Sequence, residues 1–408
     1  MPPSSKSITH RSLILAGLSK TPSKIINPLV SEDTSATKLG LESLGAQISI
    51  ENNNYHVNNP IIQGGSKINC YNSGTTMRLL SGIAGLFSQE TILYGDNSLN
   101  KRPISDLLHK LKELDIQVND TNGYPPIRIK GPPTNKDIGI TIRGDISSQF
   151  ISSLMILSSV RGDNNQTTID ISKPIVSRPY IDLTYNMLKN AGVHIINSLN
   201  QYQIYSTQNI KFGEIDIPID ASSSAFFITL GSFEGNKIKL PKPNRMLPQA
   251  DGVILDLVLK IGVKVKESHD SITLTGSKLD GFTINIVDSP DLFPILCVLA
   301  TQAQGQSKIY GAAHLKYKES NRIQSTVKLI RDLGGIIKPL ADGAIVTGNK
   351  LEGNCTIDPL NDHRIAMAGS IAATVSKYPV NIINPSCVSV SYPRFFSDLL
   401  RCGIKVFD

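Results

Sequence analysis

Hydrophobic and polar positions follow a regular period along this chain of 408 residues. In six places an apolar helical run ends at a residue suited to a left-handed turn. Alternating apolar and polar positions follow, which predicts a helix that leads into a strand. The turn residues recur about every 70 residues, at Gly45, Asp115, Gly192, Gly262, Gly334 and Gly403. Glycine predominates because it adopts positive φ at least cost.

A second series of helices interleaves with the first and keeps the same period. Each member begins with a polar, hydroxyl-rich cap and continues as an almost uncharged apolar run, which predicts a helix buried on all sides. The six segments are residues 5–18, 72–87, 146–160, 220–233, 288–301 and 361–375. Helices of the first series, such as "ISDLLHKLKEL" (104–114), are amphipathic and are expected outside or half-buried.

Two series with one period indicate an internal repeat. Each repeat holds two helices and several strands, close to the order β-α-β-α-β-β, so the expected fold class is α/β. A chain of this length is too long for one ordinary core. Six repeats divide naturally into two domains of three, and the expected boundary lies near "EIDIPID" (214–220). We therefore expect domains at 6–219 and 220–408, the latter joined by residues 1–5.

Composition narrows the choice of partners. The chain is 40% hydrophobic and 18% charged, which is typical of a globular protein, and its formal net charge is +7. Its cations are scattered and it has no Trp, which argues against nucleic acid and an anionic membrane as partners and favours small polyanions. The five cysteines have no ligand spacing and fit reduced thiols in the cytoplasm. No apolar run reaches the ~20 residues that span a bilayer.

Positive charge gathers where the predicted helices begin. A buried helix presents free N–H groups and partial positive charge at its first turn, which is a ready site for an anion. The stretch "SKSITHR" (5–11) adds two hydroxyls and the cations Lys6 and Arg11 at such a start. Asp291 and Glu319 stand among similar cations, where a carboxylate stays ionised and can act as a base. We find no metal-ligand spacing and no nucleotide-binding motif, so we expect no metal and no cofactor.

A known family carries the same set of motifs in the same order. The motifs are "SKSITHR", "NSGTTMR", "KRPISDLL", "GDISSQF", "SRPYIDLT", "DASSSAFF", "SPDLF", "KYKESNR" and "NDHRIAM". Through them the chain resembles the 5-enolpyruvylshikimate-3-phosphate synthases, which are enolpyruvyl transferases. The resemblance implies an inside-out α/β barrel of two domains. Each domain would hold three βαβαββ units with buried parallel helices and sheets outside, and the active site would lie in the cleft between the domains.

The resemblance also implies a reaction of the shikimate pathway. The enolpyruvyl group of phosphoenolpyruvate passes to the 5-hydroxyl of shikimate 3-phosphate by addition and elimination through a tetrahedral ketal, and phosphate is released. No cofactor takes part. We expect a cytoplasmic monomer that acts on these two small anions.

The family's site residues carry over where its motifs match. Those for shikimate 3-phosphate would be Lys6, Ser7, Arg11, Ser147, Ser148, Gln149, Ser177, Tyr180, Asp291 and Lys318. Those for phosphoenolpyruvate would be Lys6, Gly74, Arg102, Gln149, Arg322 and Arg364. The resemblance makes Asp291 the base for the 5-hydroxyl, and Glu319, with Lys6, the proton donor to the methylene carbon.

Three departures from the family pattern affect these expectations. Val390 stands where members usually carry a Lys that contacts phosphoenolpyruvate, and Lys316 or Arg394 would have to compensate. His314 aligns with an Asn that helps to bind shikimate 3-phosphate. The family also has a strand before its first motif, whereas this chain starts at Met1 with almost nothing to form one.

Several alternatives stay open at this stage. The sister enzyme that acts on UDP-N-acetylglucosamine shares the fold, but its first motif has Asn in place of Ser7 and its loop often carries a reactive Cys. Here no Cys lies between Cys70 and Cys297. RNA 3′-phosphate cyclases contain related repeats, yet basic runs and aromatic residues are scarce here. Taken without the resemblance, Glu319 could form a surface ion pair and Asp291 could simply stabilise a helix start.

Overall fold

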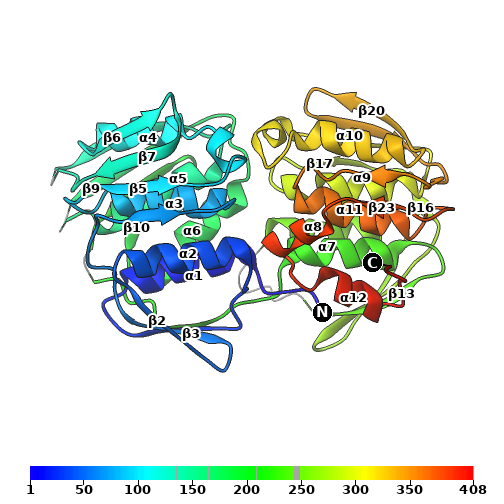
Figure 1. The fold of residues 1–408 in the computed structure, drawn as a ribbon, viewed down its shortest axis with the longest axis horizontal. Helices are drawn as coiled ribbons and strands as arrows, with labels where there is room; N and C mark the ends of the chain where they lie inside the picture. Colours follow the sequence, from blue (N-terminus) through cyan, green and yellow to red (C-terminus); the bar gives the residue numbers. More distant parts are fainter. Residues whose placement is uncertain (135, 163–164, 208, 243–248, 408) are drawn as a thin grey trace. The chain divides into compact units, whose positions relative to one another are not determined.

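The computed structural model describes residues 1–134, 136–162, 165–207, 209–242 and 249–407. The chain folds into two compact units (Figure 1). The N-terminal unit is Ser4–Ile217, and the C-terminal unit is Pro218–Asp408 together with Met1–Pro3. The boundaries thus lie at 4 and 217 where the sequence suggested 6 and 219. Within the described residues, no helix is long and apolar enough to cross a membrane.

The N-terminal unit repeats one order of elements three times: a buried helix, a strand, an outer helix and three strands. Its helices are α1 (Lys6–Leu18), α2 (Glu32–Ser43), α3 (Gly74–Ala84), α4 (Ser105–Glu113), α5 (Ser148–Val160) and α6 (Arg178–Asn190). Its strands are β1 (Ser23–Ile26), β2 (Gln47–Glu51), β3 (Asn54–Asn59), β4 (Lys67–Asn69), β5 (Thr91–Tyr94), β6 (Gln117–Thr121), β7 (Tyr124–Lys130), β8 (Ile138–Arg143), β9 (Gln166–Ser172), β10 (His194–Ser198), β11 (Gln201–Tyr205) and β12 (Glu214–Asp216). A short 3-10 helix, η1 (Leu99–Lys101), precedes α4.

Three four-stranded sheets of this unit have the same plan. Their strand orders are β12-β1-β3-β2, β4-β5-β7-β6 and β8-β9-β11-β10. In each sheet the first pair is parallel and the next two pairs are antiparallel. In the first sheet the parallel partner comes from the end of the unit, with Lys24 opposite Glu214. Strand β12 therefore fills the place beside β1 that β4 and β8, the strands ahead of α3 and α5, fill in the other two sheets.

The C-terminal unit alternates inner and outer helices in the same way, but the number of strands between them varies and most strands are shorter. Its helices are α7 (Ala221–Ser232), α8 (Val253–Lys260), α9 (Phe293–Thr301), α10 (Arg322–Asp332), α11 (His363–Ala373) and α12 (Phe395–Arg401). Its strands are β13 (Lys237–Pro241), β14 (Lys264–Glu267), β15 (Ser271–Thr275), β16 (Leu279–Asp280), β17 (Thr283–Asn285), β18 (Ala303–Gln304), β19 (Gln306–Tyr310), β20 (Ile336–Leu340), β21 (Gly343–Thr347), β22 (Thr356–Ile357) and β23 (Asn381–Ile382). Its 3-10 helices are η2 (Ala250–Gly252), η3 (Pro290–Leu292), η4 (Ala313–Tyr317) and η5 (Pro385–Val390).

Strand pairing in the C-terminal unit is less regular. One sheet, β17-β19-β21-β20, repeats the four-stranded plan, and β13-β15-β14 has three strands. The pairs β16–β18 and β22–β23 are parallel. The alternating segment expected after Gly403 forms no strand over residues 404–407. That expectation was wrong, because these residues follow α12 without a β-partner in the described chain.

Every predicted turn residue at a helix end has positive φ. The φ angles are 99° at Gly45, 61° at Asp115, 92° at Gly192, 111° at Gly262, 83° at Gly334 and 82° at Gly403. Each stands directly after the last residue of an outer helix and its cap, as the C′ position requires. The repeat predicted from the spacing is therefore present in the backbone itself.

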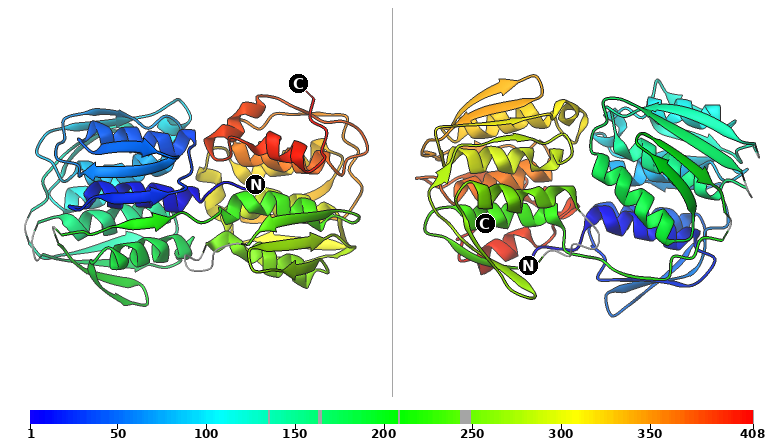
Figure 2. Two further views of the ribbon diagram at one scale, coloured as in Figure 1. Left: turned by 90° about the horizontal axis from the view of Figure 1, so that it is seen from below. Right: turned by 180° about the vertical axis from the view of Figure 1, so that it is seen from behind.

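The inner helices are buried as predicted. Every residue of α7 and of α9 is buried, and so are the central residues of α1, from Ile8 to Gly17. Figure 1 shows hairpins β2–β3 and β6–β7 at the outer sides of the N-terminal unit, with α1, α2, α3 and α5 between them. The two views in Figure 2 show the same layering within each unit, with the strands outside the inner helices.

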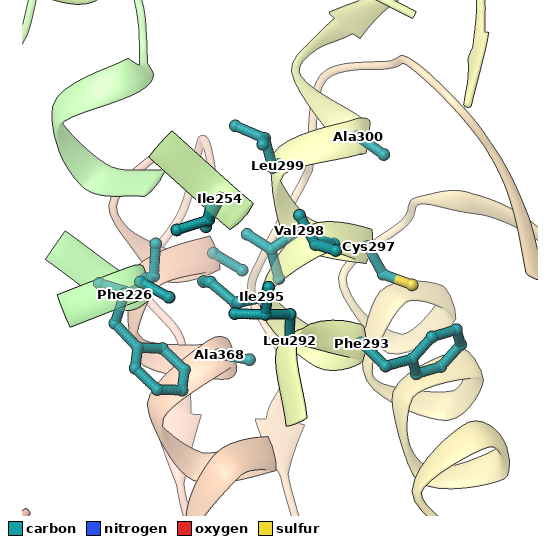
Figure 3. Packing of buried hydrophobic residues seen from close by; sticks show 14 of the residues in the cluster. Phe226, Ile254, Leu292, Phe293, Ile295, Cys297, Val298, Leu299, Ala300 and Ala368 are labelled. Atoms are coloured by element: carbon teal, nitrogen blue, oxygen red, sulfur yellow. The ribbon is translucent and has the colours of Figure 1, made fainter. Parts of the chain in front are cut away.

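The core of the C-terminal unit fixes the backbone from which one candidate site residue projects. Leu292, the neighbour of Asp291 in η3, is completely buried. Figure 3 shows Leu292 and Ile295 among side chains from three other helices: Phe226 of α7, Ile254 of α8 and Ala368 of α11. Full burial of one such side chain contributes about 1.5–3 kcal/mol, so η3 is held firmly.

Candidate active site

An ion pair marks the start of the N-terminal unit's first helix. Lys6 is the first residue of α1, and Asp33 lies in the first turn of α2, where a carboxylate also favours the helix dipole. Lys6 Nζ lies 2.8 Å from Asp33 Oδ2, and the Lys6 side chain is 18% exposed. The ammonium group is therefore held in place yet remains accessible.

Two guanidinium groups lie over the start of α3. Ser73 caps this helix, and its first residue is Gly74. A Cβ atom on Gly74 would lie 3.3 Å from Arg102 Nη1 and 3.4 Å from Arg78 Nη1, so a larger residue would crowd both cations. Arg102 donates to the backbone oxygen of Asn72 at 3.2 Å and to its Oδ1 at 2.5 Å. The helix N-terminus and both cations thus converge on one place.

Gln149 links the start of α5 to that of α3. Ser147 caps α5, accepting a hydrogen bond from the Gln149 backbone N–H at 3.3 Å. The Gln149 side chain accepts from Arg78 at 2.7 Å and donates to Thr75 Oγ1 at 2.9 Å. We call seven residues at the starts of α1, α2, α3 and α5 and near them the N-terminal cluster: Lys6, Asp33, Gly74, Thr75, Arg78, Arg102 and Gln149.

Arg11 is a buried cation among neutral groups. Its Nε donates to Thr184 Oγ1 at 2.7 Å, and its two Nη atoms donate to the backbone oxygens of Ser7 at 3.0 Å and Tyr180 at 3.2 Å and to Ser152 Oγ at 3.2 Å. Burial lowers the pKa of Arg11 to about 10. Because these partners supply no negative charge, the site favours an anion.

Ser177 has an unusual backbone at the start of α6. It is the N-cap of that helix with φ 54° and ψ 38°, in the left-handed region, and its hydroxyl makes no capping bond. The following Arg178 donates to Asn200 Oδ1 at 3.1 Å and to the backbone oxygen of Leu199. Ser177 therefore keeps a buried hydroxyl that the helix itself does not use.

Arg322 is the centre of a dense ion network in the C-terminal unit. It opens α10, is 1% exposed and contacts three carboxylates. Its Nε lies 3.0 Å from Asp362 Oδ2, its Nη1 lies 2.8 Å from Asp291 Oδ1, and its Nη2 donates to Glu319. Burial lowers the pKa of Arg322, but Asp362, Glu319 and Asp291 raise it by more.

Three cations form ion pairs with Asp291. Besides Arg322, it contacts Arg364 Nη2 at 3.0 Å and Lys318 Nζ at 3.5 Å. Burial raises the pKa of Asp291, but Arg364, Lys318 and Arg322 together hold it far below its usual range. Asp291 is thus ionised in the structure. We call Asp291, Lys318, Glu319, Arg322, Asp362 and Arg364 the C-terminal cluster.

Asp362 joins two helix starts in this cluster. It is completely buried and caps α11, accepting from the backbone N–H of Arg364 at 3.0 Å. It also accepts from Ser320 Oγ at 3.0 Å. Because the same carboxylate binds Arg322, it fixes the first turns of α10 and α11 relative to each other.

Comparisons with known proteins decide the family. The model of EPSP synthase (3-phosphoshikimate 1-carboxyvinyltransferase) matches residues 1–399. The chain belongs to the EPSP synthase family. A 3-phosphoshikimate 1-carboxyvinyltransferase of Methanocorpusculum labreanum is 38% identical, covering 98% of this chain and 95% of that protein. One from Nitrosopumilus maritimus is 37% identical, covering 99% and 96%. This EPSP synthase family member is therefore a transferase.

The fold of a solved EPSP synthase matches too. The enzyme from Acinetobacter baumannii superposes with a TM-score of 0.81 at 26% identity, covering 98% of this chain and 94% of that one. The expected fold class is therefore confirmed for this chain.

The structure brings most of the predicted site residues together within their own units. Lys6, Gly74, Arg102 and Gln149 belong to the N-terminal cluster, and Ser147 caps the helix that carries Gln149. Ser7 and Tyr180 lend backbone oxygens to Arg11, Ser148 begins α5 and Ser177 begins α6. Asp291, Lys318, Glu319, Arg322 and Arg364 form the C-terminal cluster.

Sequence reasoning missed the carboxylates that hold these cations. Asp33 and Asp362 resemble ordinary acids at helix starts, and their cationic partners come from other elements. Asp251 is also new. It is 1% exposed, accepts a hydrogen bond from Ser222, and has a pKa raised to about 7 by burial and by Asp291. Its sequence context, "QADG" (249–252), gave no signal of this burial.

The departures from the family pattern are visible in the structure. Val390 is 8% exposed in η5, so no cation stands at that position. Lys316 Nζ lies over the Tyr317 ring at 5.5 Å. His314 is 6% exposed, and neither ring nitrogen has a hydrogen-bond partner in the described chain. Burial and Lys318 lower the pKa of His314 to about 4, so the imidazole is neutral.

Proposed function

We propose that the two clusters of this enzyme together transfer the enolpyruvyl group of phosphoenolpyruvate to the 5-hydroxyl of shikimate 3-phosphate. The single observation that carries the proposal is Asp291, a carboxylate held ionised by three cations at a rigid position. It supplies the base that the 5-hydroxyl needs. The surrounding cations supply charge for anionic groups in the reaction.

The cations of Asp291 also explain how its basicity is adjusted. With a pKa far below its usual range, Asp291 alone is a weak base. In the proposal Arg322 and Arg364 bind anionic groups of phosphoenolpyruvate. The added negative charge offsets their field at Asp291 and raises the pKa of this carboxyl. Substrate binding therefore prepares the base.

The remaining groups complete the addition and the elimination. Glu319, with Lys6, delivers a proton to the methylene carbon of phosphoenolpyruvate, and its C2 becomes cationic. The 5-hydroxyl oxygen attacks C2 and gives its proton to Asp291, which forms the tetrahedral ketal. The C2–O bond to phosphate then breaks with its electron pair leaving on phosphate, and Glu319 takes back a proton from the methyl group, which restores the double bond. Holding both reactants together removes most of the entropic barrier.

The proposed division of binding follows the local charge. Arg11, surrounded by neutral groups, takes the carboxylate of shikimate 3-phosphate. Ser147, Ser148 and Ser177 lie at helix starts and take its phosphate with Lys318. Lys6, Gly74, Arg102, Arg322 and Arg364 hold phosphoenolpyruvate, and Ser7, Gln149 and Tyr180 complete the sites. Because these residues come from both units, we propose that activity needs both units of the chain.

Two coarser features belong to the same proposal. All five cysteines are free thiols, which supports a reducing cytoplasm as the place of action. Both substrates are small enough for one copy of the chain to hold them, so we propose a monomer as the working form.

The test of this proposal is Asp291→Asn. The variant should lose about 10²- to 10⁴-fold in kcat, because the base is gone, while it still binds phosphoenolpyruvate in the presence of shikimate 3-phosphate by calorimetry. The matched control is Asp280→Asn, at an exposed aspartate of the same unit, which should keep normal turnover. Wild-type turnover in Asp291→Asn, with an unchanged melting temperature, would remove Asp291 from the mechanism.

A further inference from the structure

Two polar contacts, one helical turn apart, join α1 to α2 in the N-terminal unit. The outer contact is the ion pair Lys6–Asp33, at 2.8 Å. The inner contact is His10 Nδ1 to Thr37 Oγ1, at 2.7 Å. Each partner of the inner contact follows its counterpart in the outer contact by four residues, so the two contacts lie on the same faces of the two helices.

Thr76 of α3 contacts the α2 partner of each of these two contacts, Thr37 and Asp33. Its hydroxyl lies 2.7 Å from Thr37 Oγ1 and 3.2 Å from the backbone oxygen of Asp33. It also lies 2.7 Å from Ser73 Oγ, the group that caps α3. Thr37 and Thr76 are completely buried, and Ser73 is 1% exposed. Water therefore cannot replace these bonds, and losing one leaves a buried polar atom without a partner.

The start of α3 is the part of the unit that carries the N-terminal cluster. Gly74 lies beneath Arg102 and Arg78, and Thr75 binds Gln149. Thr76 is the next residue, and it is the one that ties this turn to Asp33 and, through Asp33, to Lys6. The groups that its hydroxyl contacts, on Thr37, Asp33 and Ser73, are a hydroxyl, a backbone oxygen and a hydroxyl.

We propose that Thr76 is a positioning residue for phosphoenolpyruvate: its hydroxyl sets the place of Lys6 relative to Gly74 and Arg102. The inference rests on the proposed function, in which these three residues hold that substrate. It assigns to one buried hydroxyl an effect on the binding of phosphoenolpyruvate. The groups around Arg11 use a separate set of hydroxyls, Ser152 and Thr184, which lie 2.8 Å apart.

The experiment compares two buried threonines of the same unit. Thr76→Val should raise the KM for phosphoenolpyruvate about tenfold and leave the Kd of shikimate 3-phosphate, measured by calorimetry, within twofold. Thr76→Ser should restore the wild-type KM, because it keeps the hydroxyl. Thr184→Val removes a direct partner of Arg11 and should give the reverse pattern. Thr229→Val, at a buried hydroxyl in α7 without a hydrogen-bond partner in the described chain, should change neither.

The outcomes distinguish a failure of the role of Thr76 from a failure of the proposed function. A Thr76→Val enzyme that folds and shows unchanged KM for phosphoenolpyruvate would overturn the inference, and so would equal losses for both substrates. If Lys6→Ala and Arg102→Ala also leave that KM unchanged, the proposed site itself is wrong. If those two variants raise it while Thr76→Val does not, only the role of Thr76 fails. If Thr76→Val does not fold, Thr37→Val tests the same series of hydrogen bonds and should raise the KM for phosphoenolpyruvate.

Discussion

Two buried arginines of this enzyme have opposite electrostatic surroundings. Arg322 contacts Asp291, Glu319 and Asp362, which outweigh its burial and raise its pKa. Arg11 contacts neutral oxygens, and burial lowers its pKa to about 10. Arg322 therefore contacts carboxylates of the protein itself, whereas the hydrogen-bond partners of Arg11 are all neutral. This contrast supports the proposal that Arg11 takes the carboxylate of shikimate 3-phosphate.

Because of His314, the free energy of unfolding should fall as the pH becomes acid. Its pKa is about 4 in the folded chain and about 6.5 when unfolded, so the unfolded state binds the proton first as the pH falls. Between pH 7.5 and 5 this one residue should cost about 2 kcal/mol of unfolding free energy. His314→Asn should remove that part of the loss in urea unfolding at the two pH values. An unchanged pH dependence in His314→Asn would contradict the buried neutral imidazole.

At the scale of single residues, the sequence predicted the cations and carboxylates of the candidate site but not the two carboxylates that hold those cations in place. Asp291, Glu319 and Arg322 stand in short motifs with distinctive spacing. Asp33 and Asp362 could not be found in the same way, because an acid at a helix start is usually explained by the helix dipole. Only the fold brings Asp33 to Lys6 and Asp362 to Arg322, across 27 and 40 residues of sequence.

The elements follow from local rules that act six times. An outer helix ends at a C′ residue with positive φ, and a buried helix starts beneath a polar cap. Five of the six C′ residues are glycine. The exception, Asp115, has φ 61° and accepts from Thr134 and Lys136 at 3.1 Å and 3.0 Å. These contacts at an exposed site offset a part of the backbone cost.

Gly192 allows that backbone cost to be measured alone. Its φ is 92°, and a Cβ there would meet nothing within 4 Å, so Gly192→Ala adds strain without a clash. We expect a loss of about 1 kcal/mol in the urea unfolding of the N-terminal unit. Gly139→Ala, where a Cβ also meets nothing and φ is ordinary, should be neutral or slightly stabilising. Equal effects of the two substitutions would contradict the left-handed cap.

Local periodicity could not predict strand partners between distant segments. The place of β12 beside β1 depends on closing the N-terminal unit on itself, with Ile25 opposite Ile215. Nothing in a window of ten residues contains that information. The same limit explains the expected strand after Gly403, where alternation was present and a β-partner was not.

At the scale of the whole molecule, the chain passes twice between its units. The first crossing follows Pro3 and the second follows Ile217. The short N-terminal segment is tied to the C-terminal unit: its amino group lies 2.8 Å from Asp398, and the Pro3 oxygen accepts from the Asp220 backbone N–H at 2.8 Å. Each unit carries one cluster of ionised groups, and the proposed chemistry needs both. The net charge of +7 suits two anionic substrates.

Phosphate release from phosphoenolpyruvate is the most direct test of this account. The wild-type enzyme should release phosphate when shikimate 3-phosphate is the acceptor, and it should form one enolpyruvyl ether for each phosphate. With UDP-N-acetylglucosamine as the acceptor it should release none above the background without an acceptor. Turnover with the UDP sugar and none with shikimate 3-phosphate would contradict the central claim.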